Sequence, residues 1–126
     1  MVKCLELWLP APPSVNNMYR SGRGRVYRST GYKRWQQEAD LAFIQAGGLR
    51  PWSAYPVCVE IDLFPGPQYR QRDLDNIVKP LLDFLVYRSV LADDSTQHIR
   101  RVVVQFQSER LQSNQVRLRI RKASSL

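Results

Sequence analysis

The sequence predicts an α+β fold: a single two-layer domain in which a mixed β-sheet packs against two main helices, in the order β-α-β-α-β-β. Four segments alternate between apolar and polar residues, as half-buried strands do. Two segments with apolar residues at helical spacing separate the first three of these strands. The 126 residues contain no repeat, low-complexity segment or linker, so residues 1–126 are expected to form one domain.

The chain is predicted to begin with a strand and a basic loop. Residues 3–9 alternate, and the prolines at positions 10, 12 and 13 end the strand because proline cannot donate to a sheet ladder. Residues 14–17 and 20–25 are predicted as loop. The second of these stretches holds three arginines and two glycines, which is typical of a flexible basic arm.

A helix and a second strand are predicted next. Within residues 29–48, a Ser or Thr can cap a helix, an apolar stripe that includes Trp35 follows, and two glycines end it. Trp35 is expected in the core rather than as a platform for stacking bases. Residues 57–64 then alternate, which places Glu60 and Asp62 on the polar side of a strand.

A second helix is predicted from residues 73–76 to Arg88, with apolar residues on two adjacent stripes. An apolar face of this width indicates burial from two sides, including at a subunit interface. Pro80 conflicts with the pattern, because a proline inside a helix removes a hydrogen bond and clashes one turn back, at a cost of roughly 3 kcal/mol. Either the helix kinks at Pro80, or its regular part starts after residues 73–76.

Two more strands are predicted after a turn at residues 93–95. Residues 102–106 and 116–120 alternate, and arginines at 117, 119 and 121 lie opposite the apolar side of the last strand. Because only about seven polar residues join the two strands, they are predicted to form a hairpin.

The charge of the chain indicates a polyanionic partner. Lys and Arg together number 19 and Asp and Glu 11, which gives a net charge of +8 and a pI of about 10.0. A basic domain binds nucleic acid through its phosphates, because binding releases counterions. Solubility alone would also explain such a charge, so composition by itself leaves the two explanations equal.

The sequence also predicts the compartment. No apolar run approaches the roughly 18 residues of a membrane span, so no membrane association is expected. The first residues lead directly into a strand pattern, without a signal peptide. Cys4 and Cys58 lie in predicted strands, lack the spacing of a zinc site, and are expected to be reduced and buried. These features predict a cytoplasmic protein.

Several carboxylates concentrate around one short segment of this basic chain. Asp73 and Asp75 bracket the start of the second predicted helix, and Asp75 shares a helical face with Lys79. After about three helical turns the chain returns toward the sheet, where Asp93 and Asp94 are expected to rejoin the group. Converging carboxylates need a cation between them, and hard oxygen ligands suit Mg²⁺, for which Mn²⁺ is expected to substitute. Such a site can hydrolyse a phosphodiester, with Lys79 stabilising charge in the transition state.

The same residues also have a purely structural explanation. Aspartates at helix starts are common caps worth roughly 1 kcal/mol, and they interact favourably with the helix dipole. An exposed Asp75–Lys79 pair would add only a few tenths of a kcal/mol. Taken alone, the D-x-D-N pattern favours capping, and the basic setting together with the second acidic pair favours a metal site.

A set of ordered motifs runs over nearly the whole chain: Leu9-Pro10 with Pro12-Pro13-Ser14-Val15-Asn16 and Tyr19, the loop Arg23-Gly24-Arg25, the helix opened by Ser29, Arg72-Asp73-Leu74-Asp75-Asn76 with Lys79 and Asp83, and Asp93-Asp94. In these motifs and their separations the chain resembles the RusA family of crossover-junction endonucleases, which occur in phages and prophages. Ordered matches at family-like separations are much more specific than any single motif.

The resemblance implies a homodimer that recognises four-way DNA junctions and nicks two strands symmetrically. A junction with two-fold symmetry needs two active sites, which a C₂ dimer supplies. The resemblance also implies essential roles for Asp73, Asp75, Lys79 and Asp94. The three aspartates are interpreted as metal ligands and the lysine as a stabiliser of transition-state charge, and Asp93 is a further candidate ligand.

Other residues are expected to support this site. Asp83 is predicted to pair with Lys79 one turn on, Asn76 to orient the first turn of the helix, and Asn16 to support the site or contact phosphate. The candidates for phosphate contact are Arg23, Arg25, Arg70 and Arg72.

The sequence departs from the family pattern on both sides of the acidic pair. Where the family usually has glycine in the preceding turn, Arg88-Ser89-Val90 stands, and a left-handed conformation would cost Ser89 roughly 1 kcal/mol. After the pair, Ser95-Thr96-Gln97-His98 stands where the family tends to have glutamine and then an aliphatic residue. His98 is expected to be a turn or strand residue.

Three other functions stay open at this point. The same site could cut other branched or flapped DNA. The chain could instead be a basic DNA-binding protein without catalysis, in which the aspartates only cap the helix. A phage accessory protein that has lost activity is the third, and the intact set Asp73, Asp75, Lys79 and Asp94 argues against it.

Overall fold

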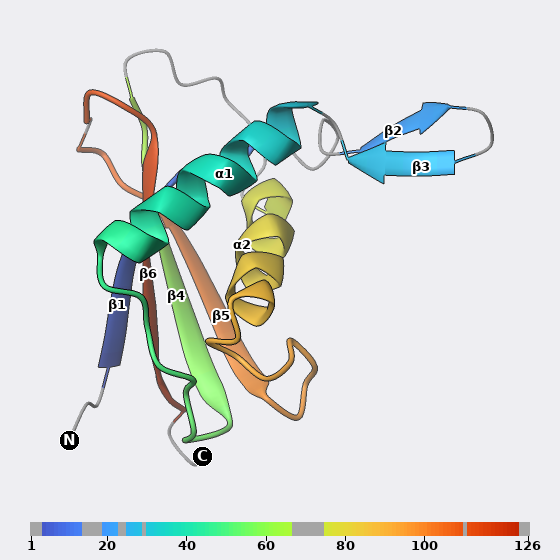
Figure 1. Cartoon of the computed structure of the whole chain (residues 1–126). Coiled ribbons are helices and arrows are strands. Elements are labelled where there is room, and N and C mark those ends of the chain that lie inside the picture. Colours follow the sequence, from blue (N-terminus) through green and yellow to red (C-terminus); the bar gives the residue numbers. More distant parts are fainter. Residues whose placement is uncertain are drawn as a thin grey trace.

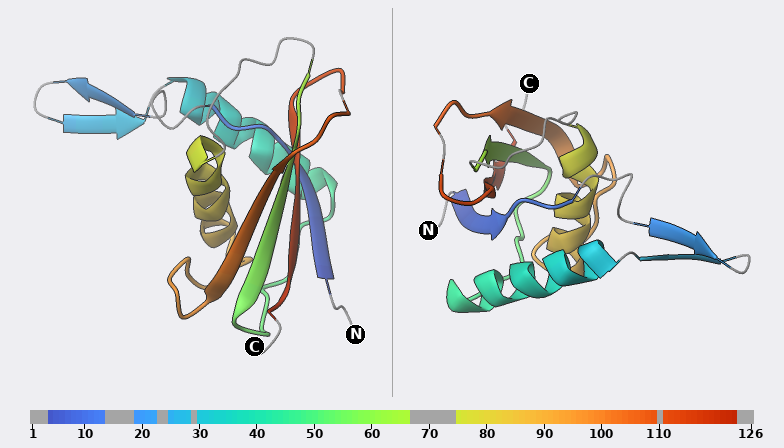
Figure 2. Two further views of the ribbon diagram at one scale, coloured as in Figure 1. Left: turned by 180° about the vertical axis from the view of Figure 1, so that it is seen from behind. Right: turned by 90° about the horizontal axis from the view of Figure 1, so that it is seen from above.

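A four-stranded sheet with two helices on one of its faces forms the body of the protein (Figures 1 and 2). The computed structural model describes residues 4–13, 19–22, 25–28, 30–66, 75–109 and 111–123, with the backbone alone for 19–22, 25–28 and 75–76. The sheet contains β1 (Cys4–Pro10), β4 (Val57–Phe64), β5 (Ile99–Phe106) and β6 (Gln115–Lys122), and the helices are α1 (Thr30–Gln45) and α2 (Asp75–Tyr87). The predicted α+β class, mixed sheet and order of these elements are confirmed.

The strand order is β1-β6-β4-β5, so the predicted hairpin between the last two strands is wrong. β6 is antiparallel to both of its neighbours, β1 and β4, while β5 pairs with β4 in parallel. Parallel neighbours require a crossover connection, and α2 supplies it between β4 and β5. Consequently α2 runs back along the sheet from the carboxyl end of β4 to the amino end of β5 (Figure 1).

The core lies between the sheet and the helices. From β4, the side chains of Val57, Val59, Ile61 and Leu63 are all buried there. Each helix contributes an apolar stripe to the same cluster: Tyr32, Trp35, Ala39 and Phe43 from α1, and Ile77, Leu81, Phe84 and Leu85 from α2. Burial of each large apolar side chain stabilises the fold by roughly 1.5–3 kcal/mol. The core position predicted for Trp35 is confirmed.

A second, two-stranded sheet occupies part of the segment predicted as loop. β2 (Tyr19–Gly22) and β3 (Arg25–Arg28) pair antiparallel, and Gly22 lies opposite Arg25. The hairpin extends from the body near the start of α1 (Figure 1). Two tyrosines and a valine around a short glycine-containing connection were the available signal, but the many arginines and glycines favoured a loop.

Both helices end in the same hydrogen-bond pattern. At the end of α1, the Gly47 amide donates to Ile44 and the Gly48 amide to Phe43, and Gly47 has a φ of 91°. At the end of α2, Ser89 donates to Val86 and Val90 to Leu85, and Ser89 has a φ of 60°. This is the Schellman motif, which places a left-handed residue after the helix. The left-handed conformation anticipated for Ser89 is confirmed.

The helix α2 includes Pro80, and it is already helical at Asp75 and Asn76. Of the two alternatives open from the sequence, a kink at Pro80 and a late start, the late start is therefore wrong. Cys58 is buried as expected, but Cys4 is exposed, because it opens an edge strand on the face away from the helices. Among the described residues, no helix has the length and apolar character needed to cross a bilayer.

The face of the sheet away from the helices, called here the open face, carries a network of hydrogen-bonded charged side chains. Asp62, only 1% exposed, accepts hydrogen bonds from Gln107, Arg117 and Arg119 at 2.8–3.0 Å. Glu60 pairs with Arg119 and Arg121 at 3.2 and 3.0 Å. The sheet register sets Asp62 opposite Arg117 and Glu60 opposite Arg119, so β6 neutralises the carboxylates of β4.

Aromatic side chains cover one end of this network. The guanidinium carbon of Arg117 lies 5.6 Å from the ring centre of Trp8 and 5.3 Å from that of Phe64. The two rings are themselves 5.1 Å apart. Cation–π contacts of this kind stabilise the arginine by roughly 0.5–2 kcal/mol, and they shield the buried Asp62–Arg117 pair from water.

Replacing Ser89 by glycine is expected to stabilise the protein. Glycine adopts a positive φ without the steric cost that a Cβ incurs, so Ser89→Gly should raise the free energy of unfolding by about 1 kcal/mol in a urea titration. Ser89→Ala, which keeps the Cβ, serves as the control and should give no gain. Equal stability of the glycine and alanine variants would refute the strain at this position.

Removing the buried charge of Asp62 is expected to destabilise the fold. Asp62→Asn leaves Arg117 and Arg119 without their shared counter-charge and should lower the free energy of unfolding by roughly 2 kcal/mol, less than for a fully buried pair because both arginines are partly exposed. The control is Glu6→Gln, whose carboxylate is 52% exposed and 4.0 Å from Arg117. It should change stability by less than about 0.5 kcal/mol. Similar losses in the two variants would contradict this assignment.

Candidate active site

The first group of predicted site residues lies at the start of α2. Asp75 and Asn76 are the first two residues of this helix. Arg25 begins β3, and its backbone alone is described. Outside the described residues lie Asn16, Arg23, Arg70, Arg72 and Asp73. Asp75 therefore opens α2, one helical turn before Lys79.

The chain is anchored where it leaves the sheet toward this helix. The amide of Gly66, just after β4, donates to the side-chain oxygen of Asn114, and the amide of Leu111 donates to the carbonyl of Pro65 at 3.0 Å. A Cβ at position 66 would lie 2.9 Å from the backbone of Ser113 and Asn114, so only glycine fits without a shift. The segment before α2 thus starts from a fixed point beside the β5–β6 connection.

Lys79 lies in the second turn of α2, and its ammonium group is 3.3 Å from the carboxylate of Asp83. The predicted pairing of these two residues is confirmed. The Lys79 side chain is 58% exposed, and an exposed pair at this spacing contributes only about 0.3–0.5 kcal/mol. The lysine can therefore exchange this carboxylate for a phosphate oxygen at small cost.

The second acidic group forms an exposed turn between α2 and β5. Asp93 and Asp94 are both exposed, and the Asp94 amide donates to the carboxylate of Asp93 at 2.8 Å. This bond and one with the Ser95 side chain, aided by the nearby His98, hold the pKa of Asp93 below its ordinary value. Asp93 is thus an anion throughout the neutral range, which is the form that binds a cation.

The turn starts from a rigid base. Val90 and Leu91, immediately before it, are buried, and the carbonyl of Val90 accepts a hydrogen bond from the Trp52 amide at 2.9 Å. Two residues earlier, Arg88 binds the Asp40 carboxylate of α1 at 2.7–2.8 Å and lies over the ring of Phe43. The end of α2 is therefore tied to both α1 and the α1–β4 loop.

One chain does not bring Asp75 and the Asp93–Asp94 turn together. At a rise of about 1.5 Å per residue, the 13 residues of α2 separate its ends by roughly 18 Å. Figure 1 shows the start of α2 and the loop that follows its end at opposite ends of the helix. The return of Asp93 and Asp94 toward the helix start, expected from the sequence, does not occur, because the parallel pairing of β4 and β5 sends the chain the other way. Accordingly, no group of three potential metal ligands occurs among the described residues of one chain.

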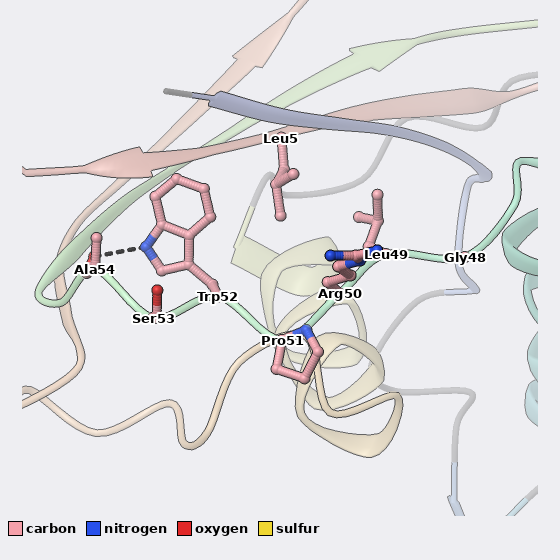
Figure 3. A pocket seen from close by; sticks show the side chains of 8 residues that line it. All are labelled: Leu5, Gly48, Leu49, Arg50, Pro51, Trp52, Ser53 and Ala54. Carbon is pink, nitrogen blue, oxygen red and sulfur yellow. Dashed lines mark hydrogen bonds between the residues drawn. The ribbon is translucent and has the colours of Figure 1, made fainter. Parts of the chain in front are cut away.

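A pocket of about 510 Å³ lies between β1 and the α1–β4 loop, and no residue of either acidic group lines it (Figure 3). Leu5 and the indole of Trp52 line it, together with the backbone and side chains of residues 48–54. Arg50 is the one charged residue of this lining, which holds no carboxylate. The pocket therefore lacks the groups that a phosphodiester-cleaving site needs, and the acidic groups at the ends of α2 remain the candidate.

An exposed lysine, an exposed acidic turn and a basic chain fit a protein that acts on a polyanion. Comparison with known proteins identifies the family to which the chain belongs. The profile of the endodeoxyribonuclease RusA family matches residues 10–121. Among the relatives, the crossover junction endodeoxyribonucleases RusA of Enterobacteria phage 82 and of Escherichia coli K12 are each 35% identical over 98 residues, which cover 78% of this chain and 80% of the relative. The protein of the same name from Enterobacteria phage HK97 is 32% identical over 87 residues, 68% of this chain and 70% of the relative.

The chain therefore belongs to the RusA family, and it is an endodeoxyribonuclease. The matched range contains both acidic groups and Lys79. The family resemblance found in the sequence motifs is confirmed. Two residues absent from the predicted site, Tyr55 and Ser95, contact the acidic turn. No residue pattern marked Tyr55, because its contact with Ala92 joins segments 37 residues apart.

Proposed function

We propose that this endodeoxyribonuclease resolves four-way DNA junctions by paired symmetric nicks, as a Mg²⁺-dependent homodimer that acts in DNA recombination and repair in the bacterial or phage-infected cytoplasm. The names of the phage and bacterial relatives support the junction substrate. The net charge of +8 supports binding to DNA. The single observation that carries the proposal is the position of Asp75 and of the Asp93–Asp94 turn at opposite ends of α2.

The side chains fit a hard divalent cation. Asp93 and Asp94 are exposed neighbours, and the lowered pKa keeps Asp93 ionised. Carboxylate oxygens are the ligands that Mg²⁺ prefers, and Mn²⁺ accepts the same set. Asp73 and Asp75 are the other ligands that we propose. Bound there, Mg²⁺ would supply positive charge and Lewis acidity at the scissile phosphate.

Lys79 has a separate role in the proposed reaction. Its ammonium group lies one helical turn beyond Asp75 and is exposed, so it can bind a phosphate oxygen and stabilise the charge that grows in the transition state. The ion pair with Asp83 holds the Lys79 side chain on this face of the helix until the DNA binds. Asn76 orients the first turn, and contacts to other phosphates are assigned to Asn16, Arg23, Arg25, Arg70 and Arg72.

A two-fold dimer would unite the acidic groups that one chain separates. Two α2 helices packed antiparallel about a two-fold axis place the start of each helix beside the end of the other. Asp73 and Asp75 of one subunit then meet Asp93 and Asp94 of the second, twice per dimer. Two equivalent sites of this kind match the two strands that must be nicked in a four-way junction.

The surface beside α2 supports such a dimer. Val78, Leu82 and Val86 form the second apolar stripe of α2 and are only partly buried. On the neighbouring edge strand β5, Val102 and Phe106 lie on the helix side of the sheet and are 37% and 46% exposed. Apolar side chains left exposed along one edge are typical of a protein interface.

The first experiment compares cleavage of a synthetic four-way junction with cleavage of its linear duplex, in Mg²⁺ or in EDTA. We expect symmetric nicks in the junction alone and in Mg²⁺ alone. Asp75→Asn should lower the rate by roughly 100-fold or more, because a metal contributes several kcal/mol at the transition state. Glu38→Gln, which removes an exposed carboxylate from α1, should leave the rate unchanged.

Other results would favour a different function. Cleavage of flaps or other branches in preference to the junction would indicate a different branched substrate. Binding of the junction without cutting in any divalent cation, unchanged by Asp75→Asn, would indicate a structural DNA-binding protein whose aspartates cap the helix. A monomer on junction DNA, measured by size-exclusion chromatography with light scattering, would refute the dimer.

Mixed dimers test whether the site is shared between subunits. Asp75→Asn and Asp94→Asn chains carrying different affinity tags are co-expressed and purified over both tags. In a shared arrangement, one site of the mixed dimer collects both substitutions and the other keeps both aspartates, so the mixed dimer should nick one strand at about the rate of one wild-type site. Each variant alone should be inactive. If the site lies within one chain, the mixed dimer will be as inactive as its parents.

A further inference from the structure

The turn that carries the acidic pair is held on both flanks. On its amino side, the amide of Ala92 donates to the hydroxyl oxygen of Tyr55 at 2.9 Å. On its carboxyl side, the Ser95 hydroxyl and Nδ1 of His98 form a hydrogen bond of 3.1 Å. The Ser95 carbonyl also accepts from the amides of His98 and Ile99 at 3.0 and 2.9 Å. The two flanks of Asp93 and Asp94 are therefore fixed by two aromatic side chains.

Those two side chains are in contact with each other. The rings of Tyr55 and His98 meet edge to face, with centres 4.8 Å apart and planes at 86°. Tyr55 lies in the loop before β4, and the carbonyl of His98 accepts a hydrogen bond from the Val57 amide at 2.8 Å. His98 is thus bonded directly to the central strand β4, and Tyr55 packs against His98. Both flanks of the turn are therefore held against the same strand.

The contacts of the acidic residues are internal to the turn. Ala92, Asp93 and Asp94 are all exposed, and the Asp93 carboxylate bonds the Asp94 amide and the Ser95 side chain. A metal ligand must be held within about 0.5 Å of its productive position. Side chains that touch the ligand-bearing backbone, and not the metal, provide this precision in metal sites.

We propose that Tyr55 and His98 are positioning residues that set the geometry of the Asp93–Asp94 pair for divalent-cation binding. This inference rests on the proposed function of the two aspartates as metal ligands. The Tyr55 hydroxyl fixes Ala92, His98 fixes Ser95, and the contact between their rings sets the distance between the two flanks. Neither residue touches DNA or metal in this role.

Two substitutions remove these contacts and keep the rings. Tyr55→Phe deletes the hydroxyl that accepts from Ala92, and His98→Phe deletes the nitrogen that binds Ser95 while retaining an aromatic neighbour for Tyr55. Tyr87→Phe is the matched control, because it removes the hydroxyl of an exposed tyrosine whose ring packs on Phe84. Thermal unfolding of all variants reports whether the fold is intact.

The primary readout is the affinity of the full-length protein for Mn²⁺ alone, measured by electron paramagnetic resonance of the free ion. Tyr55→Phe and His98→Phe should each weaken Mn²⁺ binding roughly 10-fold, the lower limit for loss of a supporting contact in metal sites. The Mg²⁺ concentration that gives half-maximal junction cleavage should rise by a similar factor. Saturating Mg²⁺ should restore the rate, and junction affinity in Ca²⁺ should stay at the wild-type value.

The outcomes separate this inference from the proposed function. If wild type binds Mn²⁺ and cuts junctions but both variants match Tyr87→Phe in metal dependence, the positioning role is wrong and the proposed function stands. If a folded variant loses activity that no Mg²⁺ concentration restores, with unchanged Mn²⁺ affinity, the role assigned to that residue is also wrong. If wild type neither binds Mn²⁺ nor cuts, the proposed function fails and the inference fails with it.

Discussion

Two carboxylates on the central strand, those of Glu60 and Asp62, face three arginines of β6 across the open face of the sheet. A carboxylate as buried as Asp62 is tolerated in a protein only beside opposite charge and hydrogen-bond donors, and β6 brings both. This requirement places β6 next to β4, with β1 on its other side. The remaining edge of β4 is left to β5, which arrives in parallel through the crossover helix α2. With β6 on one edge of β4, the parallel pairing of β5 on the other edge sets the direction of α2, and with it the positions of Asp75 and of the Asp93–Asp94 turn.

Local patterns in the sequence predicted local features well. The apolar–polar alternation gave the bounds of the central strand, and helical spacing placed Trp35 in the core. The family's usual glycine in the turn after α2 indicated the left-handed conformation that Ser89 adopts in its place. The i,i+4 spacing likewise predicted the contact between Lys79 and Asp83. Each of these features is decided within a few residues by hydrogen bonds, sterics or side-chain reach, so the neighbouring sequence contains the information.

Features that depend on distant segments were not accessible in the same way. The short connection between the last two strands favoured a hairpin, and only the carboxylates of β4, more than fifty residues earlier at Asp62, explain why β6 pairs elsewhere. The expected return of Asp93 and Asp94 to the start of α2 failed for a related reason, because the parallel crossover between β4 and β5 places them at the far end of the helix. The exposure of Cys4 has a similar origin, since the edge position of β1 depends on the strand order.

The crossover direction of α2 has a consequence for how such an enzyme behaves in a cell. If cutting needs the start of one helix and the end of another, a single chain is inert toward DNA. Below the dissociation constant of the dimer, activity then rises with the square of protein concentration, so a small change in expression becomes a large change in cutting. A nuclease arranged in this way stays harmless to intact chromosomes while it is scarce, without an inhibitor or a proenzyme.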